Sequence, residues 1–340
     1  MPVRVQLRIV LWFTTITVVA SSIFGHLEMR AAGGGPGSGY LRGALVGAIV
    51  CLAITFFEFL SNQRWGGWFR RQPFLALLLL RSLVYLAILL LGLTAGHFLL
   101  PTARDSGGFI RGSDLIFSAA LAVGFNLLYS VNTLLGPGVL FNFAAGRYHQ
   151  PRLEPRALLF IDLHSSTAIA ERLGETRFLV LLNRYIADLT LAIAQEGGEI
   201  HKYVGDEIIA TWRLARPGAA AAAIRACFAA RARLAARGAD YEREFGLRPE
   251  FRAGLHCGMV AIGELGVLKM EIALIGDTMN TAARIEQACR DTGHAVLASA
   301  ALLERVGDLP TGIVARALGP VALRGKGEAV ALYALAGAQG

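Results

Sequence analysis

The chain has 340 residues, of which 54% are hydrophobic, and it carries a formal net charge of +8. This apolar content exceeds that of an ordinary soluble domain, so a membrane part joined to a soluble part is the simplest explanation. Residues 1–150 hold 11 Arg and no Lys against 4 acidic residues, whereas residues 151–340 hold 22 basic against 21 acidic residues. The second half is nearly neutral and has no basic run, so no nucleic-acid partner is expected. The four cysteines lack CxxC or Cys/His spacing, which argues against a zinc site or a disulfide framework: Cys51, Cys227, Cys257 and Cys289.

Four apolar runs follow one another in the first half. They lie at 7–27, 41–60, 74–100 and 115–135, and each reaches the ~20 residues that a helix needs to cross the hydrocarbon core. Arginines cluster before the first run, between the second and the third, and after the fourth, which places these segments in the cytoplasm by the positive-inside rule. The sequence therefore predicts a multi-pass protein of the cell inner (plasma) membrane, embedded in the lipid bilayer, with both termini and the second half cytoplasmic.

Two charged residues, Glu58 and Arg81, interrupt the apolar runs, where burial of a charge is costly. Each is close enough to the cytoplasmic end of its run to extend its charge to the interface. Alternatively, the two form an intramembrane pair that couples helices. His26 and His97 lie near the outer ends, where an interfacial position is the simplest interpretation and a pH or metal role is the alternative.

A segment rich in glycine and proline, GPGVLFNFAAGRYHQPRLEPR, separates the two halves and marks a domain boundary. We expect a transmembrane domain at 1–140, a coupling linker at 141–156 and a cytoplasmic domain at 157–340. In the last of these, ALLFIDL is a strand, a helix follows from the Ser-Ser-Thr segment, and residues 201–212 form a hairpin on Gly-Asp. An alanine-rich helix from about 219 to 245 and the strand at 251–265 complete the order βαββαβ, which predicts an α+β domain with a ferredoxin-like core.

Five motifs follow one another in this half and cover nearly all of residues 157–337: FIDLHSST, GGEIHKYVGDEIIATW, FRAGLHCGMVAIGELG, IGDTMNTAARIE and LRGKG. In their order and spacing they resemble the catalytic domain of the class III nucleotidyl cyclases. The first half is similar, by its topology and the GRYHQPR segment, to the short multi-span anchors of bacterial cyclases. The resemblance implies an adenylate cyclase, a phosphorus-oxygen lyase that converts ATP into 3′,5′-cyclic AMP and pyrophosphate at a homodimer interface.

The chemistry of this family requires divalent ions, and two carboxylates stand where such ions could be held. Asp162 ends the first strand and Asp206 is at the tip of the adjacent hairpin, so both would be neighbours in the sheet. Hard oxygen ligands suit Mg²⁺ or Mn²⁺, and two ions per site can activate the ribose 3′-hydroxyl and stabilise the leaving pyrophosphate. The resemblance adds the main-chain carbonyl of Leu163 as a further ligand. Without the other motifs, Asp162 would be read as a helix-start residue and Asp206 as a turn former.

Two positions bear on the choice of nucleotide base. In the family, the position of Lys202 contacts the adenine ring nitrogen, and the second half of this arginine-rich chain contains only three lysines. The usual partner in base selection, often Asp or Thr, lies seven residues before the motif asparagine. That position is Ala273, which removes an expected hydrogen bond and leaves the choice between ATP and GTP open.

The remaining site residues lie late in the chain. Asn280 and Arg284 are one turn apart on one helix face, and the resemblance assigns them to orienting the ribose and to stabilising charge on the α-phosphate. In LRGKG, Arg324 occupies the family's phosphate-binding lysine position and Lys326 follows two residues later. His164, His256 and Cys257 flank motifs, and packing is their expected role. Two alternatives stay open beside the adenylate cyclase: a guanylate cyclase, and a membrane receptor whose cyclase-like domain is inactive but binds nucleotide.

Overall fold

The computed structural model describes residues 3–31, 36–64, 72–99, 112–135, 146–268 and 270–338. The chain divides into two compact units close to residue 145, and each is described here by itself. Some predicted features lie outside the described residues: Arg70, Arg71, Lys269, the segment 100–111 and residues 141–145 of the expected linker.

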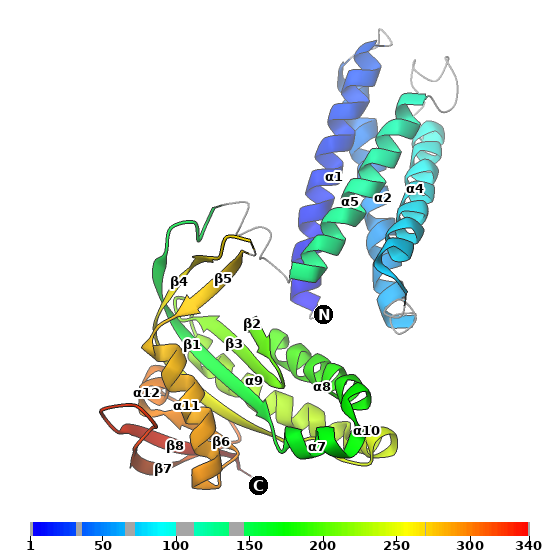
Figure 1. Cartoon of the computed structure of the whole chain (residues 1–340). Helices are drawn as coiled ribbons and strands as arrows, with labels where there is room; N and C mark the ends of the chain where they lie inside the picture. Colours follow the sequence, from blue (N-terminus) through cyan, green and yellow to red (C-terminus); the bar gives the residue numbers. More distant parts are fainter. Residues whose placement is uncertain are drawn as a thin grey trace. The chain divides into compact units, whose positions relative to one another are not determined.

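The described part of the amino-terminal unit consists of four helices (Figure 1). They are α1 (Val3–Ala31), α2 (Pro36–Arg64), α4 (Phe74–Leu99) and α5 (Gly112–Leu135). Every predicted apolar run is therefore helical wherever it is described.

The prediction of four membrane spans is confirmed only in part. Among the described residues, three helical segments are long and apolar enough to cross a membrane, at Gly39–Glu58, Phe74–Phe98 and Glu175–Gln195. The last of these belongs to the carboxy-terminal unit, where its apolar face is buried in the core. The apolar part of α5 is shorter, at Gly112–Leu128, and in the first run the described side chains begin only at Thr15.

Glycines spaced four residues apart bring α1 and α2 very close together. A Cβ atom on Gly43 would lie 2.1 Å from the main-chain oxygen of Ser21, and one on Gly39 would lie 2.6 Å from that of Gly25. Gly47 continues the same row against α1. Small residues at this spacing let helix backbones approach and pack tightly in a membrane.

A polar contact links α2 and α4. The guanidinium Nε of Arg81 lies 3.6 Å from Oε1 of Glu58, and the hydroxyl of Tyr85 donates a hydrogen bond to the same oxygen at 2.7 Å. Both charged side chains are largely buried between the helices, at 14% and 12% exposed. The structure thus agrees with the alternative in which Glu58 and Arg81 pair and couple two helices.

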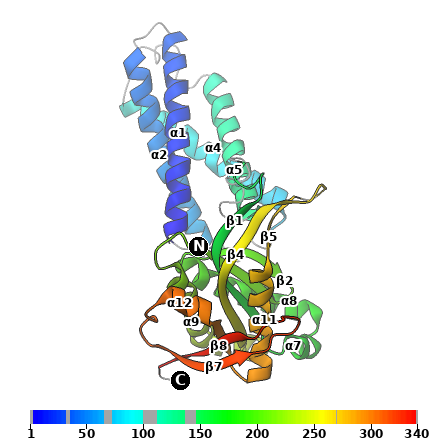
Figure 2. The same ribbon diagram turned by 90° about the vertical axis from the view of Figure 1, so that its left-hand side faces the viewer.

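The carboxy-terminal unit is built on one mixed sheet of eight strands in the order β2-β3-β1-β4-β6-β8-β7, with β5 paired to β4. β1 lies between β3 and β4 and is antiparallel to both. β4 and β5 form a hairpin that extends from the rest of the sheet (Figure 2). The strands are β1 (Arg152–Leu163), β2 (Glu199–Val204), β3 (Glu207–Arg213), β4 (Phe251–Leu265), β5 (Glu271–Ile275), β6 (Val296–Ser299), β7 (Ile313–Val321) and β8 (Val330–Gly337).

Alternate residues of β1 face two different cores, as the pleat of a strand requires. Leu159 and Ile161 face a core completed by α8 (Glu175–Gln195), α9 (Ala219–Ala236), α10 (Gly238–Phe245) and α12 (Ala300–Val306). Leu158 and Phe160 face the opposite side, where Ala282 of α11 (Asp277–Thr292) packs against them. Among the described helices, α11 therefore covers the face of the sheet opposite to α8 and α9.

Three boundaries differ from those predicted. The helix expected after the first strand is broken at Gly174, whose φ of 77° is the left-handed conformation that glycine adopts easily, into α7 (Ser166–Leu173) and α8. The alanine-rich helix is likewise interrupted at Arg237, between α9 and α10. β1 begins at Arg152, so the last residues of the expected linker belong to the sheet.

Candidate active site

Two carboxyl groups meet where the first strand ends. Asp162 is the next-to-last residue of β1, and Asp206 lies in the turn between β2 and β3, where Gly205 has a φ of 62°. β3 pairs with β1 through Ile208 and Ile161, so the turn lies beside the end of β1. The two predicted metal ligands are therefore neighbours in the structure, with Leu163 directly after Asp162.

The environment of this pair suits a divalent cation. Burial and, next, the neighbouring Asp206 raise the pKa of Asp162, while a hydrogen bond from Arg290 (Nη2 to Oδ2, 3.1 Å) acts in the opposite direction. Oδ2 of Asp206 is buried and has no hydrogen-bond donor among the described residues. A cation between these oxygens would relieve the repulsion, and hard carboxylate oxygens are ligands of Mg²⁺ and Mn²⁺.

The protein supplies only part of a coordination shell. Within the ranges that the structure describes, no group of three or more His, Cys, Asp or Glu side chains is arranged to hold a metal ion. Two carboxylates with substrate oxygens and water are the usual way in which Mg²⁺ is held at phosphate-handling sites. The residues present therefore fit an ion that is completed by its substrate.

Two glutamates near the pair, the partly buried Glu207 and the buried Glu286, were missed by the sequence analysis. Burial and the charges of Asp162 and Asp206 raise the pKa of Glu207 to about 7. Burial and, next, Asp162 raise the pKa of Glu286 to about 7, and its Oε1 has no partner in the described part of the chain. The signal for Glu286 was its place among the buried Ala282, Ile285 and Cys289 on the inner face of α11, a position where acids are rare.

The helix α11 and the loop before β8 carry the predicted phosphate and ribose residues. Asn280 is exposed and Arg284 is one turn further along. A guanidinium nitrogen of Arg284 donates a hydrogen bond to the main-chain oxygen of Arg324, and the ammonium of Lys326 binds the carboxylate of Asp277 at the start of the helix. These contacts hold the LRGKG loop against α11, so the structure brings these predicted residues together.

Asn280 and the carboxylate pair lie at different positions along the length of α11. Arg290 contacts Asp162, whereas Asn280 lies ten residues earlier, about 15 Å along the helix axis at 1.5 Å per residue. No hydrogen bond or ion pair among the described residues joins Asp162 or Asp206 to Asn280 or Arg284. Asn280 and Arg290 thus lie near opposite ends of α11, and Arg284 lies in its middle.

The two predicted base-contacting positions lie on β2 and β5. The ammonium of Lys202 lies 3.2 Å from Oε1 of Glu271, and their side chains are 49% and 40% exposed. Ala273 follows two residues after Glu271 in β5, where it pairs with Gly263 of β4. Glu271 was not considered in the sequence analysis because it does not occupy the position that the family uses.

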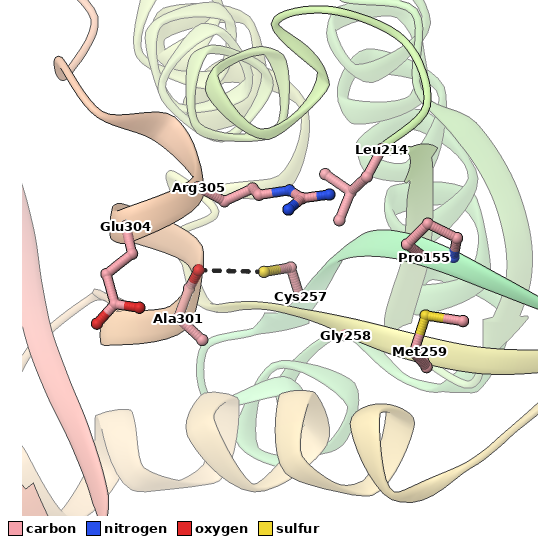
Figure 3. Close-up of a pocket in the computed structure, with 8 residues that line it drawn as sticks. All are labelled: Pro155, Leu214, Cys257, Gly258, Met259, Ala301, Glu304 and Arg305. Atoms are coloured by element: carbon pink, nitrogen blue, oxygen red, sulfur yellow. Dashed lines mark hydrogen bonds between the residues drawn. The ribbon is translucent and has the colours of Figure 1, made fainter.

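Of the three residues for which packing was expected, His256 and Cys257 pack, whereas His164 is exposed and its Nδ1 lies 3.0 Å from the hydroxyl of Ser165. His256 is hydrogen-bonded to the hydroxyl of Ser299 (2.8 Å), and burial lowers its pKa to about 4, so the ring is neutral. The thiol of Cys257 donates to the main-chain oxygen of Ala301 at 3.3 Å. Cys257 also lines a cavity of about 390 Å³ between β1, β4 and α12, across which Arg305 extends towards Leu214 (Figure 3). None of the predicted site residues lines this cavity.

Comparison with known proteins agrees with this geometry. Residues 148–337 match the family model described as the adenylate and guanylate cyclase catalytic domain. Adenylate cyclase 2 of Rhizobium meliloti (strain 1021) is 33% identical over 94% of this chain and 88% of its own length. Adenylate cyclase 1 of the same organism is 30% identical over 68% of this chain, which spans only 34% of that protein. A solved bacterial light-regulated adenylyl cyclase has the same fold, with a TM-score of 0.57, 23% identity and coverage of 66% of this chain and 65% of that one.

The mixed sheet and the match over residues 148–337 together define the catalytic domain of a nucleotidyl cyclase. The chain belongs to the adenylate and guanylate cyclase family and is an enzyme.

The contact between α11 and β4 gives a prediction. A Cβ atom on Gly254 would lie 2.3 Å from the main-chain nitrogen of Glu286 and 2.8 Å from the oxygen of Ala282. Neither main-chain atom can move without shifting α11, so Gly254→Ala should destabilise this unit by about 1–3 kcal/mol and lower activity. Thermal unfolding, followed by the fluorescence of the buried Trp212, and cyclic-nucleotide formation would measure both effects. In Gly337→Ala, another strand glycine, the nearest atom is 4.0 Å away and neither quantity should change.

Proposed function

We propose that the protein is a membrane-anchored adenylate cyclase that converts ATP into 3′,5′-cyclic AMP and pyrophosphate at a homodimer interface. The observation that carries the proposal is the partly buried pair of Asp162 and Asp206, in which Oδ2 of Asp206 has no hydrogen-bond donor among the described residues. The exposed Asn280 lies about 15 Å along α11 from Arg290, the residue that contacts Asp162. Two relatives named adenylate cyclase, one of them matched over nearly its whole length, support the choice of ATP.

In this proposal, the residues of one chain form a metal half-site, which binds the substrate through the ions that it holds. Asp162, Asp206 and the carbonyl of Leu163 would hold Mg²⁺ or Mn²⁺, two ions per site. When bound, these ions would lower the pKa of the ribose 3′-hydroxyl and neutralise charge on the phosphates. Burial and the charge of Asp162 disfavour the ionised forms of Glu207 and Glu286, and Arg290 forms an ion pair with Asp162.

The residues of the second chain form a phosphate half-site, which binds the base, the ribose and the phosphates directly. Lys202 donates a hydrogen bond to the base, Asn280 orients the ribose, and Arg284 stabilises the charge that develops on the α-phosphate as the 3′-oxygen forms its bond to phosphorus and pyrophosphate leaves. To do this, Arg284 exchanges its hydrogen bond to the main chain of Arg324 for one to the phosphate. Arg324 and Lys326 then lie close by to bind the polyphosphate.

We further propose the arrangement of the whole chain. A four-helix transmembrane domain at 1–140 is joined by a linker at 141–156 to a cytoplasmic catalytic domain at 157–340. The order β1-α8-β2-β3-α9-β4 supports a ferredoxin-like core. The apolar helices α2 and α4 support insertion into the inner (plasma) membrane.

The arginine-bearing segments predict that both termini are cytoplasmic. A reporter that is active only in the cytoplasm should therefore be active when fused after Gly340, and a reporter that is active only outside should be silent there. The same pair of reporters fused between α1 and α2 should give the opposite result. Activity of the external reporter after Gly340 would contradict this topology.

One experiment tests the function. The purified protein with Mn²⁺ should form cyclic AMP from ATP at a higher rate than cyclic GMP from GTP. A preference for GTP would make it a guanylate cyclase, an alternative that Ala273 keeps open because it offers adenine no hydrogen bond. Binding of ATP without any cyclic product would indicate an inactive nucleotide-binding receptor instead.

A further inference from the structure

The proposed base-binding position lacks a hydrogen-bond acceptor at Ala273, where the family usually carries one. A cation at Lys202 can donate to a ring nitrogen, but adenine also has a 6-amino group beside that nitrogen, which needs an acceptor. The methyl side chain of Ala273 cannot accept a hydrogen bond. If the site selects ATP by its base edge, another residue near Lys202 must supply the acceptor.

Glu271 is placed to supply it. It lies two residues before Ala273 on β5, so both side chains are on the same face of the strand. Its two carboxylate oxygens are 3.2 Å and 3.5 Å from the ammonium of Lys202, although the two residues are 69 positions apart in the chain. β5 then leads through Gly276 directly into α11, so one continuous segment presents Glu271, Asn280 and Arg284 in turn.

The ion pair between Lys202 and Glu271 is too exposed to be explained by a contribution to the stability of the fold. Lys202 and Glu271 are 49% and 40% exposed, and exposed pairs of this kind contribute little to the stability of the fold. Both side chains are therefore partly exposed to solvent, and both can keep contact with each other while they bind a ligand. A donor next to an acceptor is the pattern complementary to adenine, which has an acceptor at N1 next to the amino donor at N6.

We propose that Glu271 accepts a hydrogen bond from the 6-amino group of ATP while Lys202 donates to N1, so that Glu271 replaces the acceptor missing at Ala273. This assignment rests on the proposed cyclase function and deepens it. Guanine has the opposite order, an acceptor at O6 and a donor at N1, so the same two groups would meet it only if the base moved within the pocket. Glu271 thus selects adenine over guanine.

The test compares two nucleotides that differ only in the group concerned. The full-length protein with Mn²⁺ receives ATP or the triphosphate of purine riboside, which keeps N1 and lacks the 6-amino group. In Glu271→Ala, kcat/KM for ATP should fall about 10- to 100-fold, as expected for the loss of one hydrogen bond to a charged acceptor, whereas kcat/KM for the purine analogue should not change. Glu271→Gln keeps an acceptor oxygen and should retain most of the activity with ATP. Glu304→Ala, at an exposed glutamate of α12, should behave as wild type with both nucleotides.

Binding separates this proposal from the proposed function. Each nucleotide also competes with a ribose-labelled fluorescent nucleotide, and Glu271→Ala should reduce the affinity for ATP alone, by a similar factor. If wild type binds ATP but forms no cyclic product, the cyclase proposal fails and the affinity ratio still decides the role of Glu271. Equal losses with ATP and the purine analogue, or no loss with ATP, would overturn the assignment. If wild type binds neither nucleotide, both proposals are wrong.

Discussion

Replacement of Asp162 or Asp206 by alanine is expected to lower the rate of cyclic-nucleotide formation at least about 10²-fold, the usual cost of removing one preorganised electrostatic stabiliser. The physical reason is that each carboxylate would hold the ions that make the 3′-hydroxyl reactive. Folding should survive, because burial and Asp206 raise the pKa of Asp162, which means that the folded unit disfavours its ionised form. At neutral pH, the loss of such a charge does not remove a net stabilising contribution of that group.

The measurement is activity with Mn²⁺ beside the thermal unfolding midpoint of the same preparation. Asp308→Ala, an exposed aspartate remote from both half-sites in sequence, serves as the matched control and should leave both quantities unchanged. A variant at Asp162 or Asp206 that unfolds normally and keeps robust activity would contradict the metal assignment. Direct titration with Mn²⁺, which should bind more weakly to both variants, gives a readout that does not depend on turnover.

Two inactive variants are expected to restore activity when they form a heterodimer. Asp162→Ala damages the metal half-site and Arg284→Ala damages the phosphate half-site, and each alone should be nearly inactive. If each active site draws on both chains, the heterodimer has one intact site and one doubly damaged site. Its activity should reach about half that of the wild-type dimer, from that count of sites.

Purification through two different affinity tags would isolate the heterodimer after co-expression. The matched control combines Asp162→Ala with Asp206→Ala, because both changes lie in the same half-site and no intact site can form. Heterodimers of the first pair that stay inactive, while crosslinking shows that they have assembled, would mean that the site is built within one chain or that both sites must be intact together.

The sequence predicted the positions of the motifs better than the environment around them. Asp162 and Asp206 were expected to be neighbours because a strand end and a hairpin tip are local features, and the pKa of Asp162 shows their proximity. The contacts of Lys202 with Glu271 and of Arg290 with Asp162 join residues 69 and 128 positions apart. Only the topology of the sheet and the packing of α11 bring these residues together, and no local pattern records that.

Helix breaks and membrane spans are likewise features that local sequence patterns did not predict correctly. The periodicity around Gly174 is continuous, so only the left-handed backbone of that glycine reveals the division between α7 and α8. The helix at Glu175–Gln195 is as apolar and long as a membrane span, yet it packs its apolar face into the core of the catalytic unit. Hydropathy measures only how apolar a segment is. It cannot distinguish a helix that is surrounded by lipid from one that is buried in a protein core.

The two ends of α11 have a consequence for substrate kinetics in the proposed dimer. Through Arg290 the helix contacts the metal half-site of its own chain, and through Asn280 and Arg284 it would serve the other site. A nucleotide whose phosphate binds Arg284 would therefore act on the same helix that contacts Asp162 of the second site. A rigid element shared in this way makes binding at the two sites interdependent, so the rate should depend on ATP concentration with a Hill coefficient different from one.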